Sequence, residues 1–252
     1  MKRWISIPAV VLLSVLIGSG GMRAAELTVI TENYPPLNYV EDDVLKGPAI
    51  EIVDAIMKRL KISTPIKVLP WARGYNLVQN KANTLLFSMT RSEKRETMFK
   101  WVGPLAEKKI GMFARRGSGI VLKSMDDARK YRVGVQLAGF GMEELQRLGF
   151  ENLDPSSSPE ANLRKLLAGR MDLWYASNAT VAGNCRKLKM TDCTVEQLST
   201  TKTTWMYIAF SKGTTDAMVA DWQRTYDALY KEDVVKRIFD AAGLTSLYPS
   251  AR

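Results

Sequence analysis

The side chains that could do chemistry in this sequence are arginine, hydroxyl and aromatic residues, because the chain contains no histidine. That absence excludes the usual Ser-His-Asp and Cys-His catalytic arrangements and the commonest catalytic zinc sites. No motif of paired acids or of an activated nucleophile stands out. A carboxylate that is desolvated in a cleft needs a fixed cation, and arginine offers it two parallel N–H donors. The residue types therefore direct attention to arginines that could bind an anionic group.

Two segments place arginine beside predicted strands. Trp71 and Arg73 follow directly after one strand, at the end where α/β sheets bind their ligands. Both side chains could face a cleft, or Trp71 could lie in the core and Arg73 on the surface. Thr90 and Arg95 share the run Thr-Arg-Ser-Glu-Lys-Arg. There Thr90 and Glu93 could form a helix capping box with Arg95 in solvent, although a helix start is itself an anion site.

The two cysteines, Cys185 and Cys193, lie close together in the sequence. In an oxidising compartment we expect them to form a disulfide bond, because redox-active pairs more often have a Cys-x-x-Cys spacing. Closing so short a loop would stabilise the fold by about 2–3 kcal/mol. The pair therefore predicts a local structural staple, and the sequence implies no metal and no cofactor.

The elements that must position these residues alternate between strands and helices. Strands are predicted from short β-rich runs, and helices from apolar residues spaced three and four positions apart. The predicted strands are residues 27–31, 66–69, 84–88, 109–114, 131–136, 172–176, 194–198 and 205–210. The predicted helices are residues 47–60, 71–79, 90–96, 141–148, 158–167 and 218–229. This alternation predicts an α/β protein with largely parallel sheets.

Two short extended segments, near residues 112–118 and 200–206, divide the predicted elements into two lobes. The first lobe would be discontinuous and would comprise residues 26–114 and 204–252. The second lobe would be continuous, from residue 115 to residue 203. The glycine-rich stretch at residues 115–119 would form the first crossover between the lobes.

The amino terminus has the composition of a secretory signal peptide. Met1, Lys2 and Arg3 form a positive start, an apolar stretch follows, and small residues precede Glu26. We expect residues 1–25 to be removed and the mature protein to be periplasmic, without a lipid, because no cysteine lies near the junction. The alternative is an uncleaved anchor, although the apolar stretch is short for a membrane span.

The formal net charge of +10 is scattered along the chain rather than gathered in a long basic run. This distribution does not indicate a nucleic-acid-binding protein. A modest positive excess could, however, attract anionic solutes.

Several motifs, taken in order, resemble the family 3 extracellular solute-binding proteins. Residues 27–39, with Tyr-Pro-Pro-x-Asn-Tyr, look like the start of that family. Residues 90–95 resemble its Thr-x-Thr-x-x-Arg signature, with Ser92 in place of the second threonine, and residues 99–104 resemble its Phe-Ser-x-Pro segment. Second-lobe landmarks match at residues 133–136, Gly139 and residues 169–172.

The resemblance implies a type II periplasmic-binding-protein clamp, in which two lobes close about a hinge of two crossover segments. Such a protein would capture a small polar or anionic solute, an amino acid or related carboxylate, and deliver it to an ABC-type membrane permease. It would act as a monomer. Arg95 occupies the carboxylate-binding position of the family and Thr90 its hydroxyl partner, while Tyr34 matches an aromatic that stacks on the ligand.

The second lobe departs from the family pattern. Where the family has an aspartate that receives the ligand ammonium, this chain has Ser177 and Asn178. The small hydroxyl residue expected after Gly139 is Phe140, and Asp172 would serve the fold rather than the ligand. A standard zwitterionic amino acid is therefore in doubt: the ligand lacks a free amine, or another group receives it.

Two other functions stay open at the level of sequence. The first is an enzyme on the same scaffold, such as a dehydratase or lyase acting on a small carboxylate, with an acid such as Glu32 as its general acid or base. The second is a sensor that presents its bound state to a receptor. The fold alone does not decide among these functions.

Overall fold

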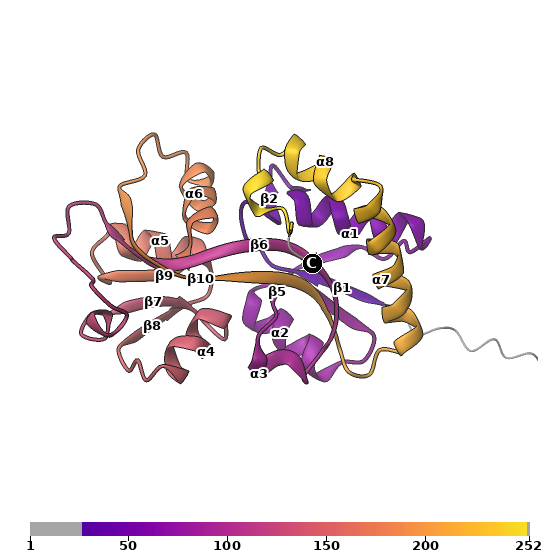
Figure 1. The fold of residues 1–252 in the computed structure, drawn as a ribbon, viewed down its shortest axis with the longest axis horizontal. Coiled ribbons are helices and arrows are strands. Elements are labelled where there is room, and N and C mark those ends of the chain that lie inside the picture. Colours follow the sequence, from indigo (N-terminus) through magenta and orange to yellow (C-terminus); the bar gives the residue numbers. More distant parts are fainter. Residues whose placement is uncertain (1–26, 251–252) are drawn as a thin grey trace, which may run out of the picture.

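Two long strands, β6 (Lys100–Arg115) and β10 (Val195–Phe210), run side by side through both lobes of the molecule (Figure 1). The structure is a computed structural model, and it describes residues 27–250. The predicted signal peptide lies outside the described residues. Helices pack on the sheet in each lobe, so the predicted two-lobed α/β fold is confirmed.

One eight-stranded sheet passes through both lobes, in the order β4-β1-β5-β10-β6-β9-β7-β8. The outer pairs of each lobe are parallel, whereas β10 pairs antiparallel with β5 and β6, and β6 pairs antiparallel with β9. The prediction of largely parallel sheets is therefore wrong at the centre, because β10 carries the chain back along β6. The remaining strands of this sheet are β1 (Thr28–Thr31), β4 (Ile66–Val68), β5 (Thr84–Thr90), β7 (Val133–Gln136), β8 (Leu153–Ser156) and β9 (Leu173–Ser177).

The first lobe contains the larger helical layer. Its helices are α1 (Pro48–Arg59), α2 (Trp71–Asn80), α3 (Glu93–Glu96), α7 (Asp216–Lys231), α8 (Val234–Ala241) and the 3-10 turn η2 (Thr245–Leu247). A small hairpin, β2 (Tyr39–Glu41) and β3 (Val44–Lys46), precedes α1. The sequence patterns did not predict this hairpin, α8, β8 or the helix that follows β9.

Helix α1 begins where a glycine and a proline meet. Pro48 suits the first helical turn, in which its missing N–H has no partner to lose. Gly47 has a φ of 111°, and a Cβ there would collide with the carbonyl of Leu37. Only glycine combines that backbone angle with so close an approach.

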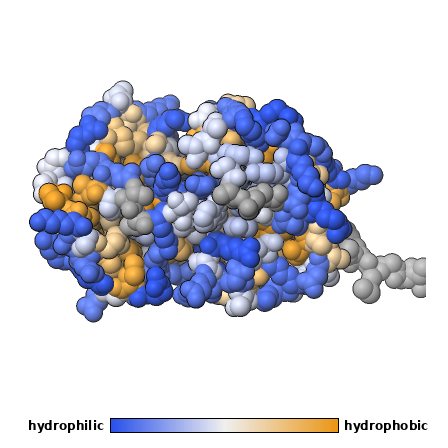
Figure 2. Space-filling model, in the orientation of Figure 1, coloured by the Kyte–Doolittle hydropathy of each residue, from blue (hydrophilic) through white to orange (hydrophobic). Residues whose placement is uncertain are grey.

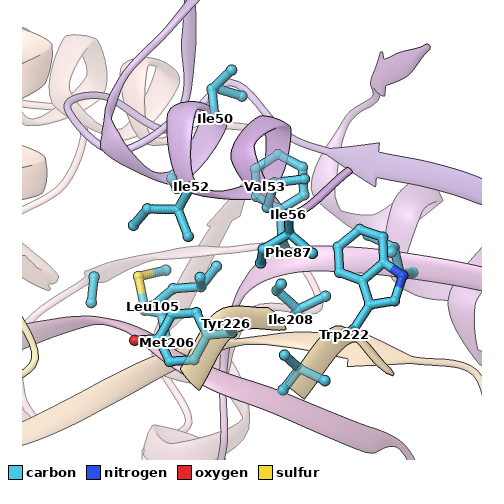
Figure 3. Packing of buried hydrophobic residues seen from close by; sticks show 14 of the residues in the cluster. Ile50, Ile52, Val53, Ile56, Phe87, Leu105, Met206, Ile208, Trp222 and Tyr226 are labelled. Atoms are coloured by element: carbon cyan, nitrogen blue, oxygen red, sulfur yellow. The ribbon is translucent and has the colours of Figure 1, made fainter. Parts of the chain in front are cut away.

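The core of the first lobe lies between α1, α7 and the sheet. Ile52 and Ile56 of α1 point toward Phe87 and Ile208 of the sheet, with Trp222 of α7 beside them (Figure 3). All five side chains are fully buried. Their burial holds the strand ends of this lobe in fixed positions, and those ends carry the candidate site.

The second lobe contains α4 (Phe140–Arg147), α5 (Pro159–Leu167), α6 (Asn178–Lys187) and the 3-10 turn η1 (Asp126–Ala128). Ser158 caps α5, because its hydroxyl accepts a hydrogen bond from the Ala161 N–H at 3.2 Å. Cys185 of α6 and Cys193 form a disulfide bond across a Cα–Cα distance of 5.8 Å, which confirms the predicted staple.

The first crossover lies earlier in the chain than residues 112–118. Ile110 to Ala114 pair with β9, and Ile110, Met112 and Ala114 pack in one cluster with Val133 of β7. The turn at residues 115–119 comes after β6 has ended, where Arg116 N–H bonds the carbonyl of Thr194. The predicted lobes, residues 26–114 with 204–252 and residues 115–203, stay a prediction.

Polar and charged side chains cover most of the face seen in Figure 2, with smaller apolar patches over both lobes. Among the helices of residues 27–250, none has the length and apolar character needed to cross a membrane.

Candidate functional site

A pocket lies between the lobes and is lined from both sides. The first-lobe side includes Glu32, Tyr34, Trp71, Ser88, Thr90, Arg95 and Lys108. The second-lobe side includes Gln136, Gly139, Phe140, Asn162, Trp174, Ser177 and Thr180. All of the predicted site residues except Arg73 line this pocket.

Direct contacts across the pocket show that the lobes are closed in this structure. Trp71 Nε1 donates to the carbonyl oxygen of Ala138 at 2.8 Å, and Thr180 Oγ1 donates to Tyr34 Oη at 2.6 Å. Gln136 Nε2 also donates to the Glu32 carboxylate. Each bond joins one lobe to the other, so opening would break all three.

Arg95 is the fixed cation of the pocket. Its side chain is fully buried, with the guanidinium carbon 5.4 Å from the Trp71 ring centroid and 4.9 Å from that of Tyr75. Arg95 Nε donates to Glu143 Oε2 of the second lobe at 2.9 Å. Among the described residues, the hydrogen bonds that the two terminal nitrogens donate to carbonyl oxygens are long, at 3.5 Å to Thr90 and at 3.4 Å to Ala138, and the Arg95 side chain also interacts with the Tyr75 hydroxyl. This edge of the guanidinium is therefore available for a stronger partner.

The capping-box alternative for Thr90 and Glu93 is wrong. Strand β5 extends as far as Thr90, and the residue that precedes α3 is Ser92, whose side chain makes no cap hydrogen bond. Thr90 is 3% exposed and Arg95 is not in solvent. The strand, rather than a helix end, thus places Thr90 beside Arg95.

The side chains of Trp71 and Arg73 lie in different environments on α2. Trp71 is buried, lines the pocket and lies over Arg95, in agreement with the alternative in which its side chain faces the cleft. Arg73 is exposed and does not line the pocket, so its predicted ligand contact is not supported. Residues two positions apart lie on different faces of a helix, which explains why only one of them reaches the cleft.

The predicted ligand-binding residues of the second lobe lie at the amino-terminal ends of two helices. Gly139 precedes α4, and Phe140 begins it. Ser177 caps α6, because its hydroxyl accepts a hydrogen bond from Thr180 N–H at 3.1 Å. Asp172 accepts a hydrogen bond from the Arg132 N–H at 2.9 Å, which is the structural role that the sequence predicted for it.

Glu32 is the acidic group of the pocket. It follows β1 and is 5% exposed. Burial raises the pKa of Glu32 to about 7, although the Gln136 hydrogen bond and the charges of Lys108 and Arg95 oppose that rise. The carboxyl group is thus poised to change its charge when a cation enters.

The sequence did not identify the pocket residues Ser88, Lys108, Gln136 and Asn162, or Glu143, which does not line the pocket but binds Arg95. Ser88 and Lys108 lie within strands, and the alternation of side chains along a strand was the signal available for them. Gln136 and Glu143 acquire their partners only when the lobes meet. No local pattern in the chain marks such contacts.

Within the described residues, no group of three His, Cys, Asp or Glu side chains is placed to hold a metal ion. The polar groups of the pocket are instead arranged around a space between Arg95 and Glu32 on one side and neutral side chains on the other. Such a site can bind a small polar solute through charge on one wall.

The model of the family described as bacterial extracellular solute-binding proteins, family 3, matches residues 27–242. The chain belongs to this family. The resemblance of its motifs to the family is thereby confirmed, and with it the class of bacterial extracellular solute-binding proteins.

Similar proteins include the L-cystine-binding protein TcyJ of Escherichia coli strain K12. It is 24% identical over 154 residues, which are 60% of this chain and 58% of that protein. The match therefore spans little more than half of each chain.

Solved structures share the fold at low identity. A histidine kinase sensor domain with similarity to periplasmic binding proteins has a TM-score of 0.78 at 20% identity, covering 88% of this chain and 96% of that one. An ancestral arginine-binding protein bound to arginine has a TM-score of 0.76 at 20% identity, covering 86% and 97%. The protein ArtJ of Geobacillus stearothermophilus, which binds arginine, lysine and histidine, has a TM-score of 0.75 at 16% identity, covering 86% and 94%.

Proposed function

We propose that this family 3 solute-binding protein captures a small amino-acid-type carboxylate by closing its two lobes, and that it delivers the solute as a monomer to an ABC-type permease. The observation that carries the proposal is the buried Arg95, whose Nε is held by Glu143 while the hydrogen bonds from its terminal nitrogens to the Thr90 and Ala138 carbonyls are long. A carboxylate at that edge would receive two parallel donors.

Glu143 supports the proposal as a positioning residue. It is 13% exposed, and its carboxylate fixes the guanidinium from the second lobe. Because the pair forms across the cleft, it also favours the closed arrangement. Exclusion of water on closure would strengthen the attraction between Arg95 and a bound carboxylate.

Glu32 supplies the group that could receive a ligand ammonium, in place of the family aspartate, whose position is occupied here by Ser177 and Asn178. A cation beside Glu32 favours its ionised form, so binding would release a proton at pH values below about 7. The affinity for an amino-acid ligand would therefore rise with pH through that value, whereas the affinity for a deaminated carboxylate would not.

The first experiment is a thermal unfolding screen of residues 26–252, purified through unfolding and refolding to remove carried ligand. The panel contains amino acids, deaminated carboxylates, amines and sugars. A ligand that binds the folded state raises the unfolding midpoint by mass action. A shift confined to carboxylates supports the proposal, and shifts with sugars or amines alone would contradict it.

Binding without turnover separates this proposal from an enzyme on the same scaffold. After incubation with the protein, the solute should be recovered chemically unchanged by mass spectrometry. Conversion of the solute would assign Glu32, the buried acid of the pocket, as the first candidate for a general acid or base.

A sensory role is the second candidate, because a histidine kinase sensor domain has the same fold. Uptake of labelled solute by cells with and without the gene distinguishes the two roles. Lost uptake supports delivery to a permease. Unchanged uptake together with an altered transcriptional response to the solute would support sensing.

A further inference from the structure

Asn162, on α5, is a pocket-lining residue with an unpaired amide. Its side chain is fully buried, and within the described residues neither Nδ2 nor Oδ1 has a hydrogen-bond partner. The residue nevertheless lines the pocket. A buried amide without partners is unfavourable, so its presence at this wall calls for a group that the pocket receives from outside.

A second asparagine in the same lobe has an amide whose hydrogen bonding is purely structural. Asn184, on α6, is 1% exposed, and its Nδ2 donates to the Thr180 carbonyl at 2.8 Å. Asn184 does not line the pocket. The two asparagines are similarly buried, but only Asn162 combines an unpaired amide with a position in the lining of the pocket.

The backbone beneath Asn162 makes room for its amide. A Cβ on Gly134 of β7 would lie 3.0 Å from Asn162 Oδ1 and would collide with Met171 Sδ. The absence of a side chain at Gly134 thus leaves the oxygen in place without providing a partner for it.

The wall around Asn162 is uncharged. Ile110, Pro159, Trp174 and Ala176 also line the pocket, from the strands β6 and β9 and the helix α5. The Lys108 ammonium is directed elsewhere, 3.5 Å from Tyr34 Oη. A charged ligand group at this wall would meet a neutral amide and apolar side chains, which would not compensate its desolvation.

We propose that Asn162 is a specificity-determining ligand contact that binds an uncharged primary carboxamide through paired donor and acceptor hydrogen bonds. The inference rests on the proposed function, in which Arg95 holds the ligand carboxylate at the opposite wall. The amide of Asn162 offers one donor group and one acceptor oxygen, and a primary carboxamide offers the complementary pair. The ligand is then an amino acid, or a deaminated relative, whose far end is a carboxamide.

The test compares matched probes by isothermal titration calorimetry on the refolded protein. L-glutamine and L-asparagine carry the carboxamide, L-glutamate and L-aspartate carry a carboxylate of the same shape, and L-arginine and L-cystine are reference ligands. Wild type should bind at least one carboxamide probe 10-fold or more tighter than its carboxylate counterpart. Equal or reversed affinities would overturn the inference.

Two variants separate ligand recognition from structure. Asn162→Leu should weaken binding of the carboxamide probe at least 10-fold, yet raise the unfolding midpoint of the ligand-free protein, because it replaces an unpaired buried amide by an apolar side chain of similar size. Asn184→Leu, the matched control, should lower that midpoint. A lowered midpoint in Asn162→Leu with unchanged binding would show a structural role and refute the proposal.

The outcomes also separate this inference from the proposed function. Binding of L-glutamate, L-arginine or L-cystine without a preference for carboxamides leaves the solute-binding proposal standing and removes the role of Asn162. Binding of none of the six probes, together with no shift from any carboxylate in the thermal screen, overturns both.

Discussion

The two walls of the pocket differ in charge. The first-lobe wall carries Arg95, Glu32 and Lys108, which are all less than a tenth exposed, whereas the second-lobe residues that line the pocket, such as Asn162 and Phe140, are uncharged. Charged groups can be kept out of water only where partners are built around them, and the first lobe provides aromatic rings and hydrogen bonds for this purpose. The charged groups that line the pocket thus belong to one lobe, while on closure the other lobe adds uncharged lining residues together with Glu143 and Gln136, which hold Arg95 and Glu32.

The largest effect should follow loss of the cation from the first-lobe wall. Arg95→Met keeps an unbranched side chain but removes the charge and leaves Glu143 without its buried partner. We expect the affinity for a carboxylate ligand to fall roughly 100-fold, or about 3 kcal/mol. Titration calorimetry measures the change.

The control for this variant is Arg73→Met, an exposed arginine on α2 that does not line the pocket. It should leave the affinity unchanged. Equal effects of the two variants would mean that net charge, rather than the Arg95 site, attracts the ligand.

The pKa of Glu32 provides the next test of the charged wall. Its value is about 7 in the folded protein and 4.5 in the absence of the fold. Between these values the folded state keeps a proton that the unfolded chain releases. The free energy of unfolding of the ligand-free protein should therefore fall by roughly 3 kcal/mol as the pH rises from about 4.5 to about 7.

Glu32→Gln should flatten that profile, as measured by urea unfolding across the range. Glu93→Gln, at an exposed position of α3, is the matched control and should keep the wild-type slope. A wild-type slope in Glu32→Gln would show that another group is responsible.

The disulfide tests whether a stabilising bond in the second lobe also affects the ligand-binding wall of that lobe. Replacing both Cys185 and Cys193 by alanine should lower the free energy of unfolding by about 2–3 kcal/mol. Neither cysteine lines the pocket, so the ligand affinity should stay within about twofold of wild type. A parallel loss of affinity would mean that the staple shapes the neutral wall.

The smallest effect concerns a contact between the two walls. Tyr34→Phe removes the acceptor of the Thr180 hydroxyl, but that hydroxyl keeps its contact with Ser177 Oγ at 2.7 Å. We expect about a fivefold loss of affinity, close to 1 kcal/mol, because only the closed form makes the bond. Tyr39→Phe, at a half-buried position of β2 away from the pocket, should have no effect.

Much of the charged wall could be predicted from the chain itself. Tyr34, Trp71 and Thr90 lie at strand ends or directly after them, and the family signature identified Arg95. The neutral wall was harder to predict, because Asn162 is a side chain on an ordinary amphipathic helix. Its significance is the lack of a partner, which only the packed structure reveals.

The long strands were also hidden in the sequence. Glycine and proline at Gly103, Pro104 and Gly111 interrupt the β-rich pattern of residues 100–115. A Cβ on Gly111 would collide with the carbonyl of Ser199, where the pairing of β6 with β10 shifts register. These residues are needed for close strand pairing, although in sequence they are typical of turns.

The paired strands β6 and β10 have a consequence for modularity. The chain passes into the second lobe along one strand and leaves it along the neighbouring one, so the two junctions lie side by side. A segment whose ends are adjacent can be grafted into a host without disturbing the core of that host. The second-lobe wall therefore lies on a continuous segment that could be exchanged as a unit. A chimera with the second lobe of another family member would change the ligand contacts of that lobe and retain those of the first lobe.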